Sequence, residues 1–136
     1  MNVLVDTTIW SLALRRNPPD RRHSDALRQL ILEHRAVLCG PVRQEVLSGI
    51  ANPTQFAALR THLQAFADVP ITTHHYELAA KYSNACRAKG VQGSHVDFLI
   101  CALAKAEKLA IYTTDADFSR YSDVIGLALF AIAAEA

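Results

Sequence analysis

Four acidic side chains occupy positions where carboxylates can do chemistry. Asp6 directly follows the apolar run "NVLV", and Asp115 directly follows "LAIYTT". Asp97 heads an unbroken apolar run from Phe98 to Ala104, where an unpaired carboxylate would be costly. Glu45 lies about one turn into an expected helix. Carboxylates are the ligands that Mg²⁺ and Mn²⁺ prefer, and these ions also bind substrate phosphates, so the set favours a metal site for phosphate chemistry.

Each of these acids also has a purely structural interpretation. Ser94 and Asp97 match the S-x-x-D/E capping box, with Ser94 as the cap and Asp97 near the positive end of the helix dipole. Asp6 and Asp115 are suited to N-cap or turn positions after a strand. Glu45, in "VRQEVL", has the pattern of an exposed helix residue. For each residue taken alone, the structural and the chemical roles both stay open.

Short aliphatic runs alternate with longer amphipathic segments, and the Pro, Gly and Asn residues fall between them. This alternation predicts repeated βα units, and hence an α/β fold with a mostly parallel sheet of four to five strands that helices cover on both faces. The expected strands lie at residues 2–5, 36–39, 68–71, 109–114 and 126–130. The expected helices are Thr8–Arg15, Arg21–Glu33, Pro41–Ile50, Thr54–Ala67, His74–Lys89, Ser94–Lys108 and Asp117–Val124.

The predicted sheet would bring the four acids together. The carboxyl ends of parallel strands share one edge, and ligands bind there, where the strand order reverses. Asp6, Asp97 and Asp115 should face this edge. The side chain of Glu45 should lean toward it, because helical side chains point back toward the N-terminus. Crowded carboxylates repel one another, so at least one should have a raised pKa in the absence of a cation.

Composition sets further limits. The chain has 136 residues, 51% of them hydrophobic, which predicts one domain with a single core. A formal net charge of +1 gives no global attraction to polyanions, so nucleic-acid contact would need a local patch. The three cysteines are odd in number and widely spaced, which is typical of reduced thiols. No signal peptide or membrane-spanning run is evident, so we expect a soluble, cytoplasmic protein with no membrane partner.

Four segments carry a family resemblance: "VLVDTTIW", "PVRQEVLSG", "SHVDFLICALA" and "IYTTDADF", in this order over most of the chain. Together they resemble the acidic motifs of the PIN-domain family, especially those of the VapC-type toxins. The resemblance implies a doubly wound, three-layer α/β/α fold, with residues 1–136 forming a single PIN-like nuclease domain. It also implies a Mg²⁺- or Mn²⁺-dependent endoribonuclease, the toxin of a type II toxin-antitoxin system, which a cognate VapB-type antitoxin neutralises.

The resemblance also implies roles for individual residues. The acidic positions of the family are matched by Asp6, Glu45, Asp97 and Asp115, which are the candidate catalytic residues and metal ligands. Asp117 matches a more variable accessory position and is a further candidate ligand. Asp6 and Asp97 would hold a first ion, and a second ion would arrive with the RNA phosphate. Asp115 or Glu45 would complete the shell of the first ion, and Glu45 would orient or deprotonate the attacking water.

Other polar residues are weaker candidates. The hydroxyls of Thr7 and Thr114 are candidates to assist the acids, although many relatives carry Asn at the position of Thr114. His74 and His75 are neighbours on an expected helix and point about 100° apart, so they are expected at the surface or partly buried rather than on one metal ion. His95, at a helix start, is expected to be solvated rather than bound to substrate.

The early part of the chain supplies candidate binding surfaces. Eight arginines fall within the first 60 residues, several of them in "LRRNPPDRRH", which favours a local patch that binds RNA phosphates. The apolar segment "TIWSLAL" and the resemblance to VapC-type toxins predict a homodimer. They also predict a groove between the early helices in which an antitoxin segment lies and places a basic side chain among the carboxylates.

Two other functions are compatible with the same fold. An aspartate-based phosphatase would use Asp6 as its nucleophile, but this class needs a second acid two positions later, where the chain has Thr8. A catalytically silent PIN-like module would bind RNA or protein and use the acids as caps. A broken acidic set would be its expected sign, and this set is intact.

Overall fold

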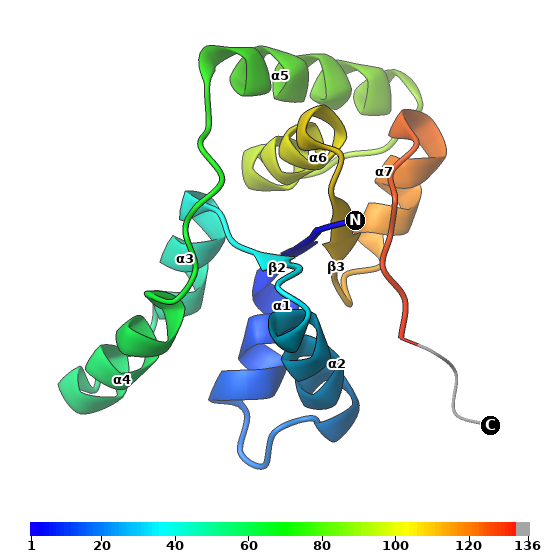
Figure 1. The fold of residues 1–136 in the computed structure, drawn as a ribbon. Helices are drawn as coiled ribbons and strands as arrows, with labels where there is room; N and C mark the ends of the chain where they lie inside the picture. The colour runs from blue at the N-terminus through cyan, green and yellow to red at the C-terminus, as the bar shows by residue number, and fades with distance from the viewer. Residues whose placement is uncertain (133–136) are drawn as a thin grey trace.

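The structure, a computed structural model, describes residues 1–132; residues 133–136 of the predicted 1–136 domain lie outside the described residues. Three short parallel strands form one sheet in the order β2-β1-β3, and helices surround it (Figure 1). The strands are β1 (Val3–Val5), β2 (Ala36–Val37) and β3 (Ala110–Tyr112). The strand order reverses at β1, because its neighbours on both sides come later in the chain. The predicted parallel α/β architecture is confirmed.

The sheet has fewer regular strands than the four to five predicted. The expected strands at 68–71 and 126–130 each contribute a single parallel bridge, at opposite edges of the sheet: Leu38–Asp68 and Ile111–Leu129. Pro70 lacks the N–H that a longer ladder would need. Gly126 takes a φ of 77° as the C-cap of the preceding helix, so extended backbone begins only after it. Both segments lie where strands were predicted, without a strand's regular hydrogen bonding.

The seven predicted helices are all present among the described residues. They are α1 (Thr7–Trp10), α2 (Arg21–Leu32), α3 (Gly40–Leu47), α4 (Pro53–Leu63), α5 (Thr73–Ala88), α6 (His95–Glu107) and α7 (Asp117–Ile125). A π-helical turn, η1 (Ser11–Arg15), continues α1. The largest differences are the ends of α3 and α4, which come earlier than predicted. Gly49, with a φ of 85°, turns the chain soon after α3.

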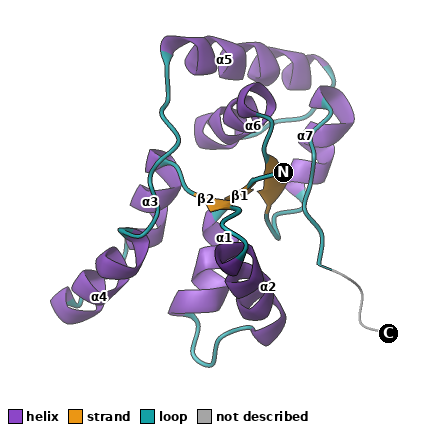
Figure 2. Cartoon of the chain, in the orientation of Figure 1, coloured by secondary structure: helices purple, strands orange, loops and turns teal. Residues whose placement is uncertain are grey.

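Helices cover both faces of the sheet. Figure 1 shows α1 and α2 on one side of the strands and α5 and α6 on the other, and Figure 2 shows how short the strands are beside the helices. All three residues of β1 are buried, as is every residue of α6 from Phe98 to Ala104. The predicted burial of this helix is therefore confirmed, and α6 holds Asp97 at its N-terminal end against the core.

The position of His75 differs from the sequence-based prediction. Its side chain is buried, with 3% exposure, instead of lying at the surface or partly buried. Nδ1 of His75 accepts a hydrogen bond from the backbone N–H of Thr72 at 2.9 Å, and Nε2 lies 2.9 Å from Oε1 of Glu107. The imidazole thus stabilises the start of α5 and links α5 to α6, because each ring nitrogen has a partner. The side chain of His75 therefore has a structural role.

The state of the cysteines agrees with the expectation from composition. Cys39, Cys86 and Cys101 are free thiols, and all three are buried. Burial raises the pKa of Cys39 to about 11, so this thiol stays protonated at neutral pH and is a poor nucleophile. None of the helices in residues 1–132 has the length and the apolar character needed to cross a membrane.

Candidate functional site

The register of β1 and β3 places Asp6 beside Thr113. Val5 pairs with Tyr112, so the next residues on the two strands, Asp6 and Thr113, are neighbours at the carboxyl edge. The backbone N–H of Asp6 donates to the carbonyl oxygen of Tyr112 at 2.9 Å. Oγ1 of Thr113 donates to Oδ2 of Asp6 at 2.8 Å. Asp6 is only 7% exposed, so these bonds hold the carboxylate in place at the point where the strand order reverses.

The environment of Asp6 disfavours its charge. Burial is the main cause and raises the pKa of Asp6 above its ordinary value of 3.8, while hydrogen bonds from Thr113 and from the backbone of Thr7 act in the opposite direction. The charges of Asp97 and Glu45 add smaller repulsions that raise the pKa further. A raised pKa was expected from crowding, but burial contributes more than crowding does. The repulsions show that Asp97 and Glu45 lie near Asp6.

Glu45 reaches the edge from α3. This helix begins at Gly40, shortly after β2, and Pro41 occupies its first turn, where a missing N–H costs nothing. Oγ1 of Thr7 donates to Oε2 of Glu45 at 3.0 Å. Thr7 follows Asp6 directly, so this bond joins the second acid to the segment that carries the first. The hydroxyl of Thr7, a candidate to assist the acids, is therefore hydrogen-bonded to Glu45.

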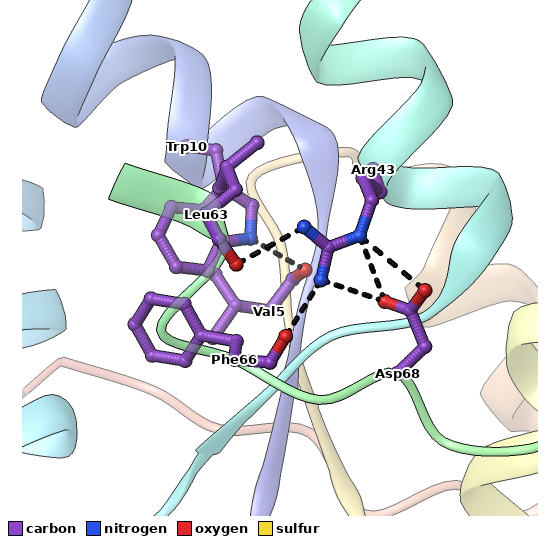
Figure 3. A network of polar contacts seen from close by, with 6 residues as sticks. All are labelled: Val5, Trp10, Arg43, Leu63, Phe66 and Asp68. Atoms are coloured by element: carbon purple, nitrogen blue, oxygen red, sulfur yellow. Dashed lines mark hydrogen bonds and ion pairs between the residues drawn. The ribbon is translucent and has the colours of Figure 1, made fainter. Parts of the chain in front are cut away.

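Arg43 fixes α3 two residues before Glu45. Nε of Arg43 donates to Oδ1 of Asp68 at 3.0 Å, while Nη1 and Nη2 donate to the carbonyl oxygens of Leu63 and Phe66 at 3.0 and 2.7 Å (Figure 3). One guanidinium thus joins α3 to the end of α4 and to the edge segment that pairs with β2. Among the early arginines, this one is engaged inside the protein and does not contribute to a phosphate-binding patch.

Aromatic packing continues this network to β1. The rings of Trp10 and Phe66 lie edge to face, with centroids 5.3 Å apart. Nε1 of Trp10 donates to the carbonyl oxygen of Val5 at 3.1 Å (Figure 3). Because Val5 precedes Asp6, the buried indole connects α1 to the strand end from which Asp6 projects. The bond also satisfies the indole N–H, which buried tryptophans usually require.

Asp97 has its structural and its candidate chemical role on different atoms. Its backbone N–H donates to Oγ of Ser94 at 3.1 Å, so Ser94 is the N-cap of α6, as predicted. The carboxylate instead accepts a hydrogen bond on Oδ2 from the hydroxyl of Tyr121 in α7, at 2.7 Å. Because Ser94 alone caps the helix, the carboxylate of Asp97 is not required as a cap.

Asp115 and Asp117 lie in the turn that follows β3. The backbone N–H of Asp115 donates to Oγ1 of Thr113 at 3.0 Å, and the backbone N–H of Asp117 donates to Oδ1 of Asp115 at 2.9 Å. Asp117 also forms an exposed ion pair with Arg120. Burial raises the pKa of Tyr121 and keeps its hydroxyl protonated; the bond to Asp97 and the charges of Asp117 and Asp115 act in the same direction. Asp115 is therefore linked to Asp6 through Thr113, and the charges of Asp115 and Asp117 also reach Tyr121.

The acids are gathered at one edge but are not arranged as a finished metal centre. Within residues 1–132, no three or more His, Cys, Asp or Glu side chains are grouped so that they could hold an ion together. The oxygen donors of Asp6, Asp97 and Glu45 nevertheless suit Mg²⁺ or Mn²⁺, and a cation would offset both the burial of Asp6 and the repulsions that raise its pKa. The donor chemistry fits a hard cation, and a shared ion would require at least one of these side chains to turn toward it.

Some of the polar residues at the carboxyl edge of the sheet were not identified from the sequence. Thr113 holds Asp6, and Thr8 accepts a hydrogen bond from the backbone N–H of Thr114 at 3.2 Å, whereas the prediction singled out the hydroxyls of Thr7 and Thr114. Thr113 would have been found from strand register, since it lies beside Asp6 once β1 and β3 are paired. For Tyr121, "DFSRYSDV" carries no signal beyond that of an amphipathic helix.

Comparisons with known proteins agree with this fold. A family model described as PIN domain matches residues 3–124. FitAcB from Neisseria gonorrhoeae has the same fold, with 24% identity, a TM-score of 0.78, and coverage of 95% of this chain and 96% of that chain. A toxin-antitoxin complex from Klebsiella pneumoniae matches with 21% identity, a TM-score of 0.65, and coverage of 87% and 91%. VapBC2 from Rickettsia felis, bound to a DNA fragment from their promoter, matches with 18% identity, a TM-score of 0.75, and coverage of 96% and 98%. No curated protein matches the sequence.

Proposed function

The chain belongs to the PIN domain family, and from this premise we propose that it is a Mg²⁺- or Mn²⁺-dependent endoribonuclease and the toxin of a type II toxin-antitoxin system. Residues 1–136 would form its single nuclease domain, acting in the cytoplasm. The observation that carries the proposal is the buried carboxylate of Asp6 at the switch point of the sheet, with the charges of Asp97 and Glu45 close enough to raise its pKa. A hard cation would offset these crowded charges.

The candidate ligands have distinct roles in this proposal. Asp6 and Asp97 would hold the first ion, Asp115 or Glu45 would complete its shell, and Asp117 would be accessory because Arg120 already pairs with it. When bound, Mg²⁺ or Mn²⁺ would supply a water of lowered pKa and positive charge for the phosphate oxygens of RNA, and a second ion would accompany the substrate.

The chain's own residues orient these groups. The hydroxyl of Thr113 holds Oδ2 of Asp6, and the hydroxyl of Thr7 holds Oε2 of Glu45. Glu45 then has its other oxygen available to orient the attacking water and to accept its proton. The low exposure of Asp6 excludes bulk water from its carboxylate, which strengthens its interaction with a cation.

We call the carboxyl edge of the sheet, with Asp6, Glu45, Asp97 and Asp115, the acidic edge. A groove beside it suits the RNA backbone. It has a volume of about 510 Å³ and is lined by Thr8, Ser11, Leu12, Arg15, Arg16 and Thr114. Two arginines in one groove can bind phosphate oxygens on either side of a cleaved bond. Because Thr8 lies 3.4 Å from the hydroxyl that holds Asp6, the groove leads to the acids. We propose Arg15 and Arg16 as the phosphate-binding arginines; Arg16 would exchange its ion pair with Asp20, at 3.6 Å, for a phosphate.

A second groove suits the proposed antitoxin. It has a volume of about 670 Å³, lies between η1, the end of α3 and α4, and is lined in part by Leu14, Ile50, Ala58 and Leu59. Leu14 is 40% exposed, so an apolar side chain of a partner would bury it. Arg15 lines both grooves, so an antitoxin segment in the second would end near the acids. The structurally similar proteins include a toxin-antitoxin complex, which supports this partner.

Two rival functions make different predictions. An aspartate-based phosphatase is disfavoured because the second position after Asp6 is Thr8, whose hydroxyl accepts a hydrogen bond from the backbone of Thr114. A silent binding module is disfavoured because Ser94, not the carboxylate of Asp97, caps α6. Neither alternative explains why the acids gather at the switch point.

The proposal is tested by incubating the purified chain with a mixture of structured and unstructured RNAs, with Mn²⁺ or with a chelator. We expect cleavage only with the metal, and none from Asp6→Asn. A phosphatase would instead release phosphate from a simple aryl phosphate ester. RNA binding without cleavage under every metal condition would establish the silent module and overturn the proposed activity.

The partners are tested by co-expression with the neighbouring gene. We expect the chain to purify with the product of that gene, and to be a homodimer when freed from it. Substituting Leu14 with Asp should release the partner without affecting RNA cleavage by the free chain. A monomer that purifies alone would contradict both the antitoxin and the dimer.

A further inference from the structure

Tyr121 is a buried tyrosine whose hydroxyl bonds to one of the candidate metal ligands. Its side chain is 0% exposed, and its hydroxyl donates to Oδ2 of Asp97 at 2.7 Å. The two residues come from different helices, α7 and α6, and lie 24 positions apart in the chain. Through this bond, a side chain of α7 orients the carboxylate of Asp97 on α6.

The chain makes room for this hydroxyl at Gly93. A Cβ at position 93 would lie 2.4 Å from the hydroxyl oxygen of Tyr121 and 2.7 Å from Cζ, which is closer than side chains pack. Gly93 is not one of the glycines with a positive φ. Its lack of a side chain therefore serves this contact and not a turn. The loop before α6 is thus fitted to the tyrosine that binds Asp97.

The ring of Tyr121 is also held on two other sides. Its centroid lies 5.0 Å from that of Phe98 and 5.2 Å from that of Phe118, with the Phe118 ring edge-on. Both phenylalanines are buried. With the ring packed in this way, the hydroxyl has one place to lie, and the carboxylate that it meets is held in one rotamer.

We propose that Tyr121 is a positioning residue for metal binding: it fixes the carboxylate of Asp97 through Oδ2 and leaves the ligand role to Oδ1. The inference rests on the proposed function and extends it to a residue outside the acidic set. A ligand held by a neighbouring hydroxyl does not have to be ordered when the ion binds, so affinity is higher than for a carboxylate that is free to rotate.

Loss of the hydroxyl should therefore weaken metal binding more than it weakens the fold. Partners that orient metal ligands typically change affinity by about 10- to 100-fold when they are removed. We expect Tyr121→Phe to raise the Kd for Mn²⁺ at least tenfold, measured by calorimetric titration of the full chain without RNA. Cleavage should fall at limiting Mn²⁺ and recover at saturating Mn²⁺, because the ligand itself is intact.

Tyr112→Phe is the matched control. Tyr112 is similarly buried, with 1% exposure, and its hydroxyl lies 2.7 Å from Nδ1 of His23 in α2 instead of bonding to a candidate ligand. The control removes one buried tyrosine hydroxyl and its hydrogen bond, as Tyr121→Phe does. Melting in chelator should show a similar loss of stability for both variants, while only Tyr121→Phe changes the affinity for Mn²⁺. Gly93→Ala, which displaces the hydroxyl without altering the tyrosine, should shift the Kd in the same direction.

The outcomes separate this inference from the proposed function. Wild-type affinity for Mn²⁺ in Tyr121→Phe, together with weakened affinity in Asp97→Asn, overturns the role of Tyr121 and leaves the metal site standing. An equal loss of affinity in Tyr121→Phe and Tyr112→Phe also overturns it, because that loss would reflect stability alone. Unchanged affinity in both Tyr121→Phe and Asp97→Asn overturns the metal assignment itself.

Discussion

Asp6 and Thr113 are 107 positions apart in the chain, yet the hydroxyl of Thr113 donates to Oδ2 of Asp6 at 2.8 Å. Adjacent parallel strands bring them together, one residue beyond the Val5–Tyr112 pair. The same hydroxyl accepts a hydrogen bond from the backbone N–H of Asp115 at 3.0 Å. Thr113 therefore links two of the candidate ligands through one oxygen, and the arrangement of the edge depends on it.

Replacing Thr113 with Val removes this link while keeping the shape of the side chain. The hydrogen bond from Thr113 lowers the pKa of Asp6, so its loss should raise that pKa further and make ionised Asp6 scarcer at mildly acidic pH. We expect the Kd for Mn²⁺ to rise about tenfold or more, and to rise further as the pH falls. Calorimetric titration at several pH values measures this. Thr61→Val, which removes an exposed hydroxyl on α4, is the control and should match the wild type.

The raised pKa of Asp6 predicts how stability depends on pH without metal. Because the native state holds this proton more tightly than the unfolded state, the free energy of unfolding should fall as pH rises through the native pKa. The penalty is relieved fully only below the ordinary value of 3.8. In chelator, Asp6→Asn should be at least as stable as the wild type at neutral pH, and the difference should shrink as the pH is lowered.

Manganese should reverse that order. An ion that binds only the native wild type stabilises it by about 2.7 kcal/mol at a hundredfold excess over Kd, and Asp6→Asn should gain little. Thermal melts of both proteins across pH, with chelator and with Mn²⁺, measure the two effects together. A stability difference that is constant across pH and unaffected by Mn²⁺ would show that Asp6 is structural.

The separation of roles at the start of α6 predicts two different phenotypes. Ser94→Ala removes the cap and should cost about 0.5 to 2 kcal/mol of stability while leaving metal-dependent cleavage in place. Asp97→Asn keeps the backbone N–H that Ser94 accepts and keeps an oxygen for Tyr121, so its stability in chelator should be close to that of the wild type. Its amide is a poor ligand for a hard cation, so cleavage should be lost. Urea unfolding and RNA cleavage of both variants check this pair, and the prediction fails if Asp97→Asn is destabilised equally in every condition.

Arg43→Lys should destabilise the protein although the charge is kept. A lysine cannot reproduce the planar set of bonds that joins Asp68 to the carbonyl oxygens of Leu63 and Phe66. We expect a loss of about 1 to 2 kcal/mol in the free energy of unfolding, measured from urea denaturation. Arg60→Lys on the exposed face of α4 is the control and should stay within about 0.5 kcal/mol of the wild type. Equal midpoints for the two variants would show that the network adds nothing to stability.

Periodicity was sufficient to place most of the fold. Each predicted helix exists, because amphipathic spacing and caps such as Asp20 and Asn52 act within a few residues of one another. The two edge strands were overestimated, since Pro70 and Gly126 limit ladder hydrogen bonds in a way that an aliphatic pattern does not reveal. Spacing and caps within a few residues therefore predicted the helices well, but they did not predict how regular the edge strands would be.

The acidic edge was harder to predict in its details than in its location. Asp6, Glu45, Asp97 and Asp115 were placed at the edge by the rule that strand ends meet there, and Asp97 and Glu45 do lie near Asp6. The bonds that hold them depend on which strands are neighbours and on helix packing, which spacing along the chain does not encode. Arg43 is the clearest case: it was one of the eight arginines in the first 60 residues that favoured phosphate binding, and it joins α3 to α4 instead.

The central place of β1 in the sheet has a consequence for synthesis. Of the three strands, β1 is made first, whereas one of its two neighbours in the sheet, β3, is made last and more than 100 residues later. Until the residues around 113 have emerged, Asp6 lacks the hydroxyl that holds it, and the turn bearing Asp115 does not exist. Long-range parallel pairing of this kind forms late. A growing chain therefore carries no assembled acidic edge until the residues around 115 have been made, so the proposed activity could not begin before then.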